Sequence, residues 1–319
     1  MTRFLLLFAI GSCLSLRALF ACDFCNCLSG INPYYNGKNR FVLNFLSQRS
    51  FRPPVLSPAS TSSFSTTKHT SLPTLMHGGH TPSAFPTTET RRSIEMMLQH
   101  HFSERFLLTA LVPFSTLTIE QGTSLSVSGI GDVSLLVHDV FEFDFLDRTI
   151  LLLGAGIKTP TGLSNLTDAK GTRLDTRFQS GTGSWDFILN PTFFASHRGF
   201  IYALDLFAKF NTSSTVGDRI GHSLSATTTL SHDIFRNNAS QMALVGIIGA
   251  RLETKSKDWI SGRFDADSDF TSLYGQVGGQ VIFHFVKLDF LVLAPLHQSR
   301  SALAMNEQTR FLTGARIEF

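Results

Sequence analysis

The chain has 319 residues, of which 43% are apolar and 16% are charged, and its formal net charge is +3. Nucleic-acid binding needs a concentrated basic face, and this small, dispersed charge argues against that class. Charged residues are also fewer than the roughly 25% usual in a soluble domain. The composition therefore raises the question of where so much apolar surface is buried.

The first 21 residues have the layout of a secretory signal. Arg3 supplies a positive start, residues 4–16 are apolar, and the run closes on Ala21. This apolar stretch is too short to cross a bilayer as a helix, and no later stretch reaches the roughly 18 residues that a spanning helix needs. An exported chain of this kind is either secreted and soluble or enters a membrane as a closed β-barrel.

From Glu89 onward, apolar and polar side chains alternate with a period of two, which is typical of β-strands. In the last segment, RFLTGARIEF, Phe311 and Ile317 share the apolar face, and the chain ends on an aromatic residue, as bacterial outer-membrane barrels do. The alternation predicts twelve strands, near residues 40–50, 90–102, 105–117, 130–145, 148–158, 184–196, 200–211, 220–235, 240–253, 271–285, 287–297 and 308–319.

The connections between these segments are alternately short and long. Outer-membrane barrels have short periplasmic turns and long outer loops, and an even number of strands returns the C-terminus to the periplasm. We therefore predict an all-β fold, a transmembrane antiparallel β-barrel of about twelve strands. The predicted organisation is a signal peptide at 1–21, a periplasmic extension at 22–39 and a barrel at 40–319, with a long outer loop at 51–89 rich in Ser, Thr and Pro.

Two motifs carry a resemblance to a known family. LLLGAGIKTPTG (151–162) and QSGTGSWDF (179–187) resemble the transporter-like outer-membrane barrels grouped with the phenol meta-pathway degradation proteins. CDFCNC (22–27) and ERFLLTALVPF (104–114) resemble a branch with a Cys-Asp-x-Cys-x-Cys run after the signal, although Asn26 replaces the expected Gly. The resemblance implies a barrel in the outer membrane of a Gram-negative bacterium with a transport role, and it names no substrate.

The residues of the first two motifs also suggest local structure. Pro160 and Gly162 predict a turn after a strand, and Trp185 suits the height of the membrane interface, where an amphipathic ring is favoured. The two motifs either shape an outer loop or contact a solute at the pore mouth.

Three roles are possible for the cysteines. Cys22, Cys25 and Cys27 follow the signal on the predicted periplasmic side, where they could bind a soft ion such as Cu(I), form a disulfide, or carry a lipid on Cys22, since LFAC (19–22) resembles a lipoprotein cleavage box. In the long outer loop, His77 and His80 either bind Zn²⁺ or Cu²⁺ or are merely polar.

The polar face of the strands is predicted to face the lumen, with Asp139 an outward exception unless a bulge turns it inward. Because both charge signs occur, this set either closes the lumen as a salt-bridged plug or lines a narrow polar passage. The inward set is Glu95, Gln99, Arg105, Asp132, His138, Glu142, Asp186, Asn190, Asp205, Lys209, Gln276, Gln280, His284, Lys287, Asp289, Arg310 and Arg316. The pore-lining candidates among them are Asp186, Lys209, Gln280, Lys287, Asp289, Arg310 and Arg316.

The sequence thus predicts a transporter or channel for a small solute, with the lipid bilayer and that solute as partners. A metal-handling outer-membrane protein that binds copper or zinc is the alternative, and a structural or adhesive barrel is the third hypothesis. No nucleophile with a base and an orienting group is recognisable, nor any phosphate-binding or dinucleotide motif, so we predict no enzymatic activity and no cofactor beyond copper or zinc. The oligomeric state is left open.

The metal-handling hypothesis predicts that replacing Cys22, Cys25 and Cys27 together by serine lowers the copper bound per chain, because thiolates bind Cu(I) far better than hydroxyls do. Elemental analysis after Cu(I) loading and dialysis measures this stoichiometry. A His77→Gln/His80→Gln variant separates any contribution of the outer loop. Unchanged metal binding in the cysteine variant would rule out the cysteine run as the metal site.

Overall fold

The computed structural model describes residues 38–52, 86–121, 123–144, 146–167, 171–301 and 305–319. The predicted signal peptide, Cys22, Cys25 and Cys27 lie outside the described residues. So do His77, His80 and most of the long outer loop. The predictions made for all of these stay predictions.

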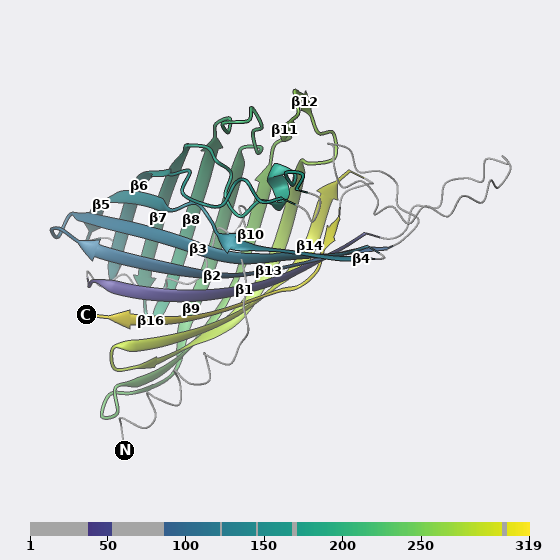
Figure 1. Cartoon of the computed structure of the whole chain (residues 1–319). Coiled ribbons are helices and arrows are strands. Elements are labelled where there is room, and N and C mark those ends of the chain that lie inside the picture. The colour runs from purple at the N-terminus through teal and green to yellow at the C-terminus, as the bar shows by residue number, and fades with distance from the viewer. Residues whose placement is uncertain (1–37, 53–85, 122, 145, 168–170, 302–304) are drawn as a thin grey trace, which may run out of the picture.

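Twelve long antiparallel strands form a closed barrel, which confirms the predicted fold class (Figure 1). The barrel closes because β1 pairs with β16 on one side and with β2 on the other. The strands are β1 (Arg40–Arg52), β2 (Thr87–His101), β3 (Phe106–Gln121), β5 (Ser134–Phe143), β6 (Arg148–Lys158), β7 (Asp186–His197), β8 (Phe200–Asn211), β9 (Ser223–Asn237), β10 (Met242–Lys255), β13 (Phe270–Phe283), β14 (Val286–Arg300) and β16 (Arg310–Glu318).

Short turns join the strands at the end where the C-terminus lies, and the longer connections lie at the other end (Figure 1). In outer-membrane barrels the short turns are periplasmic, and we name the two ends on that basis. The tightest turns need left-handed backbone, as at Gly199 with φ 81° and His284 with φ 55°. His284 was predicted to face the lumen, and this was wrong. It lies exposed in the turn between β13 and β14 because the strand ends at Phe283.

Within the described residues, five shorter elements lie outside this set of twelve. β4 (Thr123–Ile130) pairs with the outer half of β3, where a loop was predicted, and its outward residues Ser126 and Ser128 are exposed. Polar outward serines indicate that this hairpin extends beyond the hydrocarbon region. The others are η2 (Thr176–Phe178), a 3₁₀ helix, the hairpin of β11 (Trp259–Ile260) and β12 (Arg263–Phe264), and β15 (Asn306–Glu307), which pairs with β1. No helix in the described part of the chain is long and apolar enough to cross a membrane.

The outward face of the barrel is apolar, and Asp139 is an exception to it. No bulge turns Asp139 inward, because β3 and β5 pair without a register shift. Arg105 instead donates two hydrogen bonds to the Asp139 carboxylate, at 2.6 and 2.7 Å, beside a periplasmic turn. Arg105 was predicted to face the lumen, and this was wrong. Glu142 shares the inward face of Val140, as predicted, but lies exposed at the periplasmic rim, where it pairs with Arg148 at 2.6 Å.

The inner face is less polar than the sequence predicted. An apolar layer crosses the inner wall from β10 through β13, β14 and β16 to β1, formed by Leu46, Val245, Ile247, Tyr274, Leu291, Leu293 and Leu312. A second apolar patch, of Leu107, Val140, Ile150, Leu152, Phe194 and Ala203, covers the inner face of β3 to β8. Side chains can pack in this way because a twelve-stranded barrel is narrow.

A charge on the outward face at mid-height should destabilise the barrel. Val277 is 57% exposed on β13, between Ile248 and Val292 of the neighbouring strands. Val277→Arg is expected to lower the free energy of unfolding by about 2–4 kcal/mol, because the guanidinium is then placed in hydrocarbon. Equilibrium unfolding in guanidinium chloride, with the protein in lipid vesicles, measures this. The control Ser126→Arg, on the outer hairpin, should change the free energy of unfolding by less than about 1 kcal/mol. Equal effects of the two substitutions would contradict the assignment of Val277, and not Ser126, to the hydrocarbon region.

Candidate functional site

The outer end of the barrel encloses a cavity of about 240 Å³, which we call the outer vestibule. Its walls come from opposite sides of the barrel, since Gln48 belongs to β1 and Lys209 to β8. Two loop residues, Arg177 and Phe178, reach it from the connection between β6 and β7. The lining contains six cations, Arg52, Arg91, Arg177, Lys209, Lys255 and Arg300, and five carboxylates, Glu89, Asp258, Asp267, Asp269 and Glu307.

The charges in the vestibule are largely paired. Lys255 contacts Asp258 at 2.8 Å, Arg300 contacts Glu307 at 2.5 Å, and Arg91 pairs with Glu89. Arg300 also lies over the Phe270 ring, 4.2 Å from its centroid. A solute in the vestibule would therefore meet ion pairs and one aromatic face rather than an isolated charge.

Apolar side chains lie directly below the vestibule. The next inward-facing residue on β1 below Gln48 is Leu46, and the next on β8 below Lys209 is Phe207. They are only 6% and 8% exposed, so they pack against other side chains. The vestibule thus ends on apolar side chains, those of the apolar layer on β1 and that of Phe207 on β8.

Arg177 ties two outer loops together over the vestibule. Its guanidinium contacts Asp175 at 2.8 Å within its own loop and Asp265 at 2.5 Å in the loop between β10 and β13. Burial disfavours the charge on Arg177, but these carboxylates outweigh it and raise the pKa of the guanidinium. Burial likewise favours the neutral form of Asp175, yet the hydrogen bonds and charge of Arg177 hold the pKa of that carboxyl below its ordinary value. Both groups are charged at neutral pH, and the loop contact persists there.

Asp218 links the same two loops a second time. Its carboxylate accepts hydrogen bonds from the Thr176 hydroxyl at 2.5 Å and from the Ser261 backbone N–H at 2.9 Å. Together with Arg177, it fixes the loops that form the outer rim of the vestibule.

Below the rim, Arg310 joins strands that are not neighbours. It donates to both oxygens of Glu253 at 2.8 Å, from β16 across β14 and β13 to β10. It also donates to Tyr274 Oη at 2.8 Å and contacts Glu307. A bidentate arginine–carboxylate pair is among the strongest hydrogen-bonded pairs, so this cluster holds the curved wall of the barrel together.

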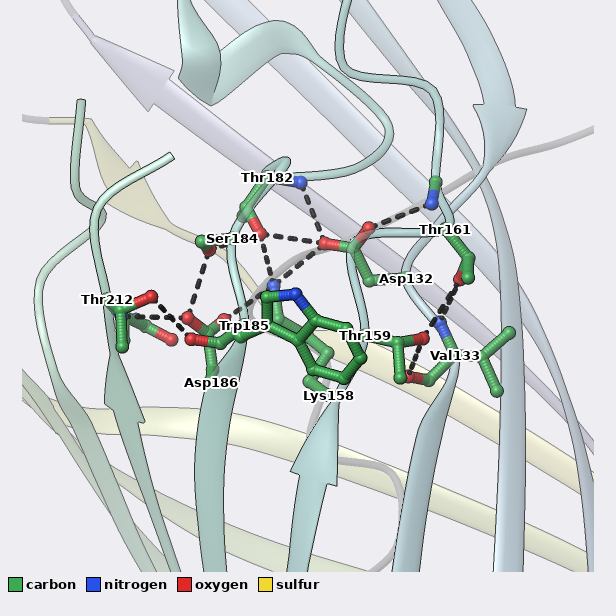
Figure 2. A network of polar contacts seen from close by, with 12 residues as sticks. Asp132, Val133, Lys158, Thr159, Thr161, Thr182, Ser184, Trp185, Asp186 and Thr212 are labelled. Atoms are coloured by element: carbon green, nitrogen blue, oxygen red, sulfur yellow. Dashed lines mark hydrogen bonds and ion pairs between the residues drawn. The ribbon is translucent and has the colours of Figure 1, made fainter. Parts of the chain in front are cut away.

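The family-like motifs meet in a second buried cluster, shown in Figure 2. Lys158 Nζ lies 2.8 Å from the Asp132 carboxylate and 2.7 Å from that of Asp186, and also contacts the Thr182 hydroxyl. Asp132 accepts further hydrogen bonds from the backbone N–H groups of Gly162, at 2.9 Å, and Thr182, at 2.8 Å. The two motifs therefore bind each other through Asp132.

Glycines let these backbones approach closely. A Cβ on Gly162 would lie 2.6 Å from a Gly131 backbone atom and 2.8 Å from a Gly181 backbone atom, which no side chain permits. Trp185 beside them is exposed on the outward face, and its carbonyl accepts the Thr212 hydroxyl proton. These contacts favour loop shaping as the role of the two motifs.

The remaining pore-lining candidates lie near the periplasmic end. Lys287 contacts Glu318 at 2.6 Å, and Arg316 contacts Asp289 at 3.4 Å. The Gln280 amide donates to Asp289. All seven pore-lining candidates are buried and face the interior, in separate clusters rather than one site. Their role toward a solute stays a prediction.

Some residues of the site were not predicted from the sequence. Glu253 and Tyr274 face inward by simple alternation, so the sequence did contain that signal. Arg177 and Asp218 lie on irregular loops, where no period exists to place them. Within the described residues, no three His, Cys, Asp or Glu side chains are arranged to hold a metal ion.

No protein-family model matches the sequence, and no curated protein matches it. Among solved structures, the COG4313 outer membrane channel from Pseudomonas putida F1 is similar in fold, with a TM-score of 0.62 and 15% identity over 91% of this chain and 100% of that chain. The β domain of the Bordetella autotransporter BrkA matches with a TM-score of 0.46 and 10% identity, over 89% of this chain and 100% of that one. LpxR from Salmonella typhimurium matches with a TM-score of 0.40 and 10% identity, over 88% of this chain and 100% of that one. The first similarity supports the outer-membrane barrel fold.

Removing the cation from the Lys158 cluster should be strongly destabilising. Lys158→Met leaves Asp132 and Asp186 buried and close together without their shared partner, and breaking a buried pair in this way costs about 3–5 kcal/mol. Equilibrium unfolding of the protein in lipid vesicles measures the loss. Adding Asp186→Asn should restore part of it. The control Lys257→Met removes an exposed outer-loop lysine and should have little effect, and an equally small effect of Lys158→Met would refute the structural role.

Proposed function

We propose that the protein is an outer-membrane channel that admits a small polar solute from outside through the outer vestibule. The observation that carries the proposal is the charge-lined vestibule that opens between the outer loops and ends on the apolar layer. Its volume, about 240 Å³, lies below the roughly 300–1,000 Å³ of pockets for drug-sized ligands. The solute is therefore small. The fold similarity to an outer membrane channel also supports the proposal.

The lining favours solutes that carry both polar and charged groups. Six cations and five carboxylates are interspersed around the vestibule, so no large field of one sign repels either anions or cations. The loop between β6 and β7 contributes Arg177 and Phe178 to this lining. Selectivity would then depend on that loop and on the paired charges below it.

The apolar layer controls passage in this proposal. Leu46, Leu291 and Leu312 are buried between the outer ion pairs and the periplasmic ion pairs. Hydrophobic constrictions limit ion flow because water and ions enter them unfavourably. Permeation therefore requires these side chains to part, and the resting conductance is low.

Passage fits the geometry better than catalysis. A serine hydrolase would need a histidine base beside its serine nucleophile. The neighbouring pair His222 and Ser223 does not supply it, because His222 Nδ1 accepts the backbone N–H of Asn211 at 3.1 Å. The alternative of copper or zinc handling stays a prediction that rests on the cysteine run and the loop histidines.

Truncating the apolar layer should increase ion flow. Leu291 is 2% exposed inside the barrel, whereas the adjacent Phe290 faces outward. Leu291→Ala is expected to raise single-channel conductance in planar bilayers about twofold or more, because the constriction becomes wider and wetter. Phe290→Ala is the matched control and should leave it unchanged. A correctly folded barrel that is silent both as wild type and as Leu291→Ala would exclude the channel function.

A further inference from the structure

Two arginines face outward side by side at the outer rim of the barrel. Arg49 of β1 and Arg92 of β2 are exposed, and both lie on the apolar face of their strands. Ser47 is opposite Arg92 and Arg49 is opposite Thr90 in the strand register. The two arginines are therefore diagonal neighbours, which places their backbones about 7–8 Å apart and lets their long side chains reach one ligand.

Their height matches that of the lipid headgroups. Ser47 is the next outward residue below Arg49, and below Ser47 and Arg92 lie Phe45 and Ile94, which belong to the apolar belt. Beyond Arg49 lies the outward aromatic Phe51. Aromatic residues flank the apolar band at the membrane interfaces, so Arg49 and Arg92 lie where the band ends.

No carboxylate of the described residues is placed to neutralise this pair. The outward arginine of the periplasmic rim differs, since Arg105 is bonded to Asp139. From residue 38 to residue 88, the sequence contains no aspartate or glutamate at all. The nearest outward carboxylate in the register is that of Glu120 on β3. Glu120 is opposite Thr88, which is the next outward-facing residue of β2 beyond Thr90. Two adjacent cations without an acid attract an external anion.

A buried hydroxyl adds an independent observation. Thr116 of β3 is opposite Arg92, on the same outward face. It is only 5% exposed, and its hydroxyl has no hydrogen-bond partner among the described residues. Burying a polar group without a partner is unfavourable. A ligand oxygen held by Arg92 would satisfy this hydroxyl.

We propose that Arg49, Arg92 and Thr116 bind the phosphate group of a lipid in the outer leaflet. Guanidinium groups match phosphate geometry through paired N–H donors, and a hydroxyl completes such a site. A lipid is the occupant because the site faces away from the lumen, directly above the apolar belt that contacts acyl chains. The site is separate from the vestibule, so this inference does not depend on solute passage.

The test compares a phosphorylated lipid with its dephosphorylated form. The purified protein in a phosphate-free maltoside detergent is titrated with diphosphorylated lipid A and with enzymatically dephosphorylated lipid A, and binding is measured by native mass spectrometry. Wild type should prefer the phosphorylated form by about tenfold or more, since hydrogen bonds to charged groups are strong. Arg49→Gln/Arg92→Gln should abolish that preference. Thr116→Val, which keeps the shape and removes the hydroxyl, should reduce it about threefold.

A matched control removes two cations elsewhere on the outer surface. Lys257 and Arg263 are exposed on and beside the β11–β12 hairpin, and Lys257→Gln/Arg263→Gln should keep the full preference. The proposal is overturned if the Arg49→Gln/Arg92→Gln protein keeps the preference, or if the control loses as much. It is also overturned if inorganic phosphate at equal concentration displaces the lipid, because the site would then bind free anions. Conductance of the same variants should equal that of wild type.

Discussion

The structure depends on one constraint: inside a bilayer, every backbone N–H and C=O group needs a partner within the protein. A sheet meets this need only when it has no edge, and the pairing of β1 with both β16 and β2 removes the edge. Closure then divides the side chains of every strand into two sets. The outward set contacts lipid and is apolar, and the inward set is shielded from lipid and tolerates charge.

The main role of the inward charges is to stabilise the barrel. Arg310 bonds Glu253 three strands away, and Lys158 joins two loop motifs through Asp132 and Asp186. Removing charges from water is costly, and their mutual attraction offsets the cost only where the geometry is good. The bidentate and multiply bonded contacts seen here meet that condition. They favour one shape of the wall and one arrangement of the outer loops.

This architecture gives the proposed channel two distinct layers. The outer vestibule presents paired charges to the outside, and the leucine layer beneath it separates these charges from the periplasmic ion pairs. Specificity and resistance to flow can thus belong to different residues. The arginine pair on the outer face of β1 and β2 adds a third role, in which the same hairpin that closes the barrel also binds the membrane.

The sequence by itself determined the twelve barrel strands and most of their faces. Alternation is a local property, so the faces of Phe311 and Arg310 could be read directly from RFLTGARIEF. The tertiary structure alone decided what each inward residue meets. Glu253 and Arg310 are 57 positions apart, and the outer loops that bring Arg177 to Asp265 have no period to read. Asp139 shows the same limit, since its outward position became understandable only when the fold placed Arg105 beside it. Local alternation fixes which way a side chain points, whereas its partner depends on curvature and closure, which involve the whole barrel.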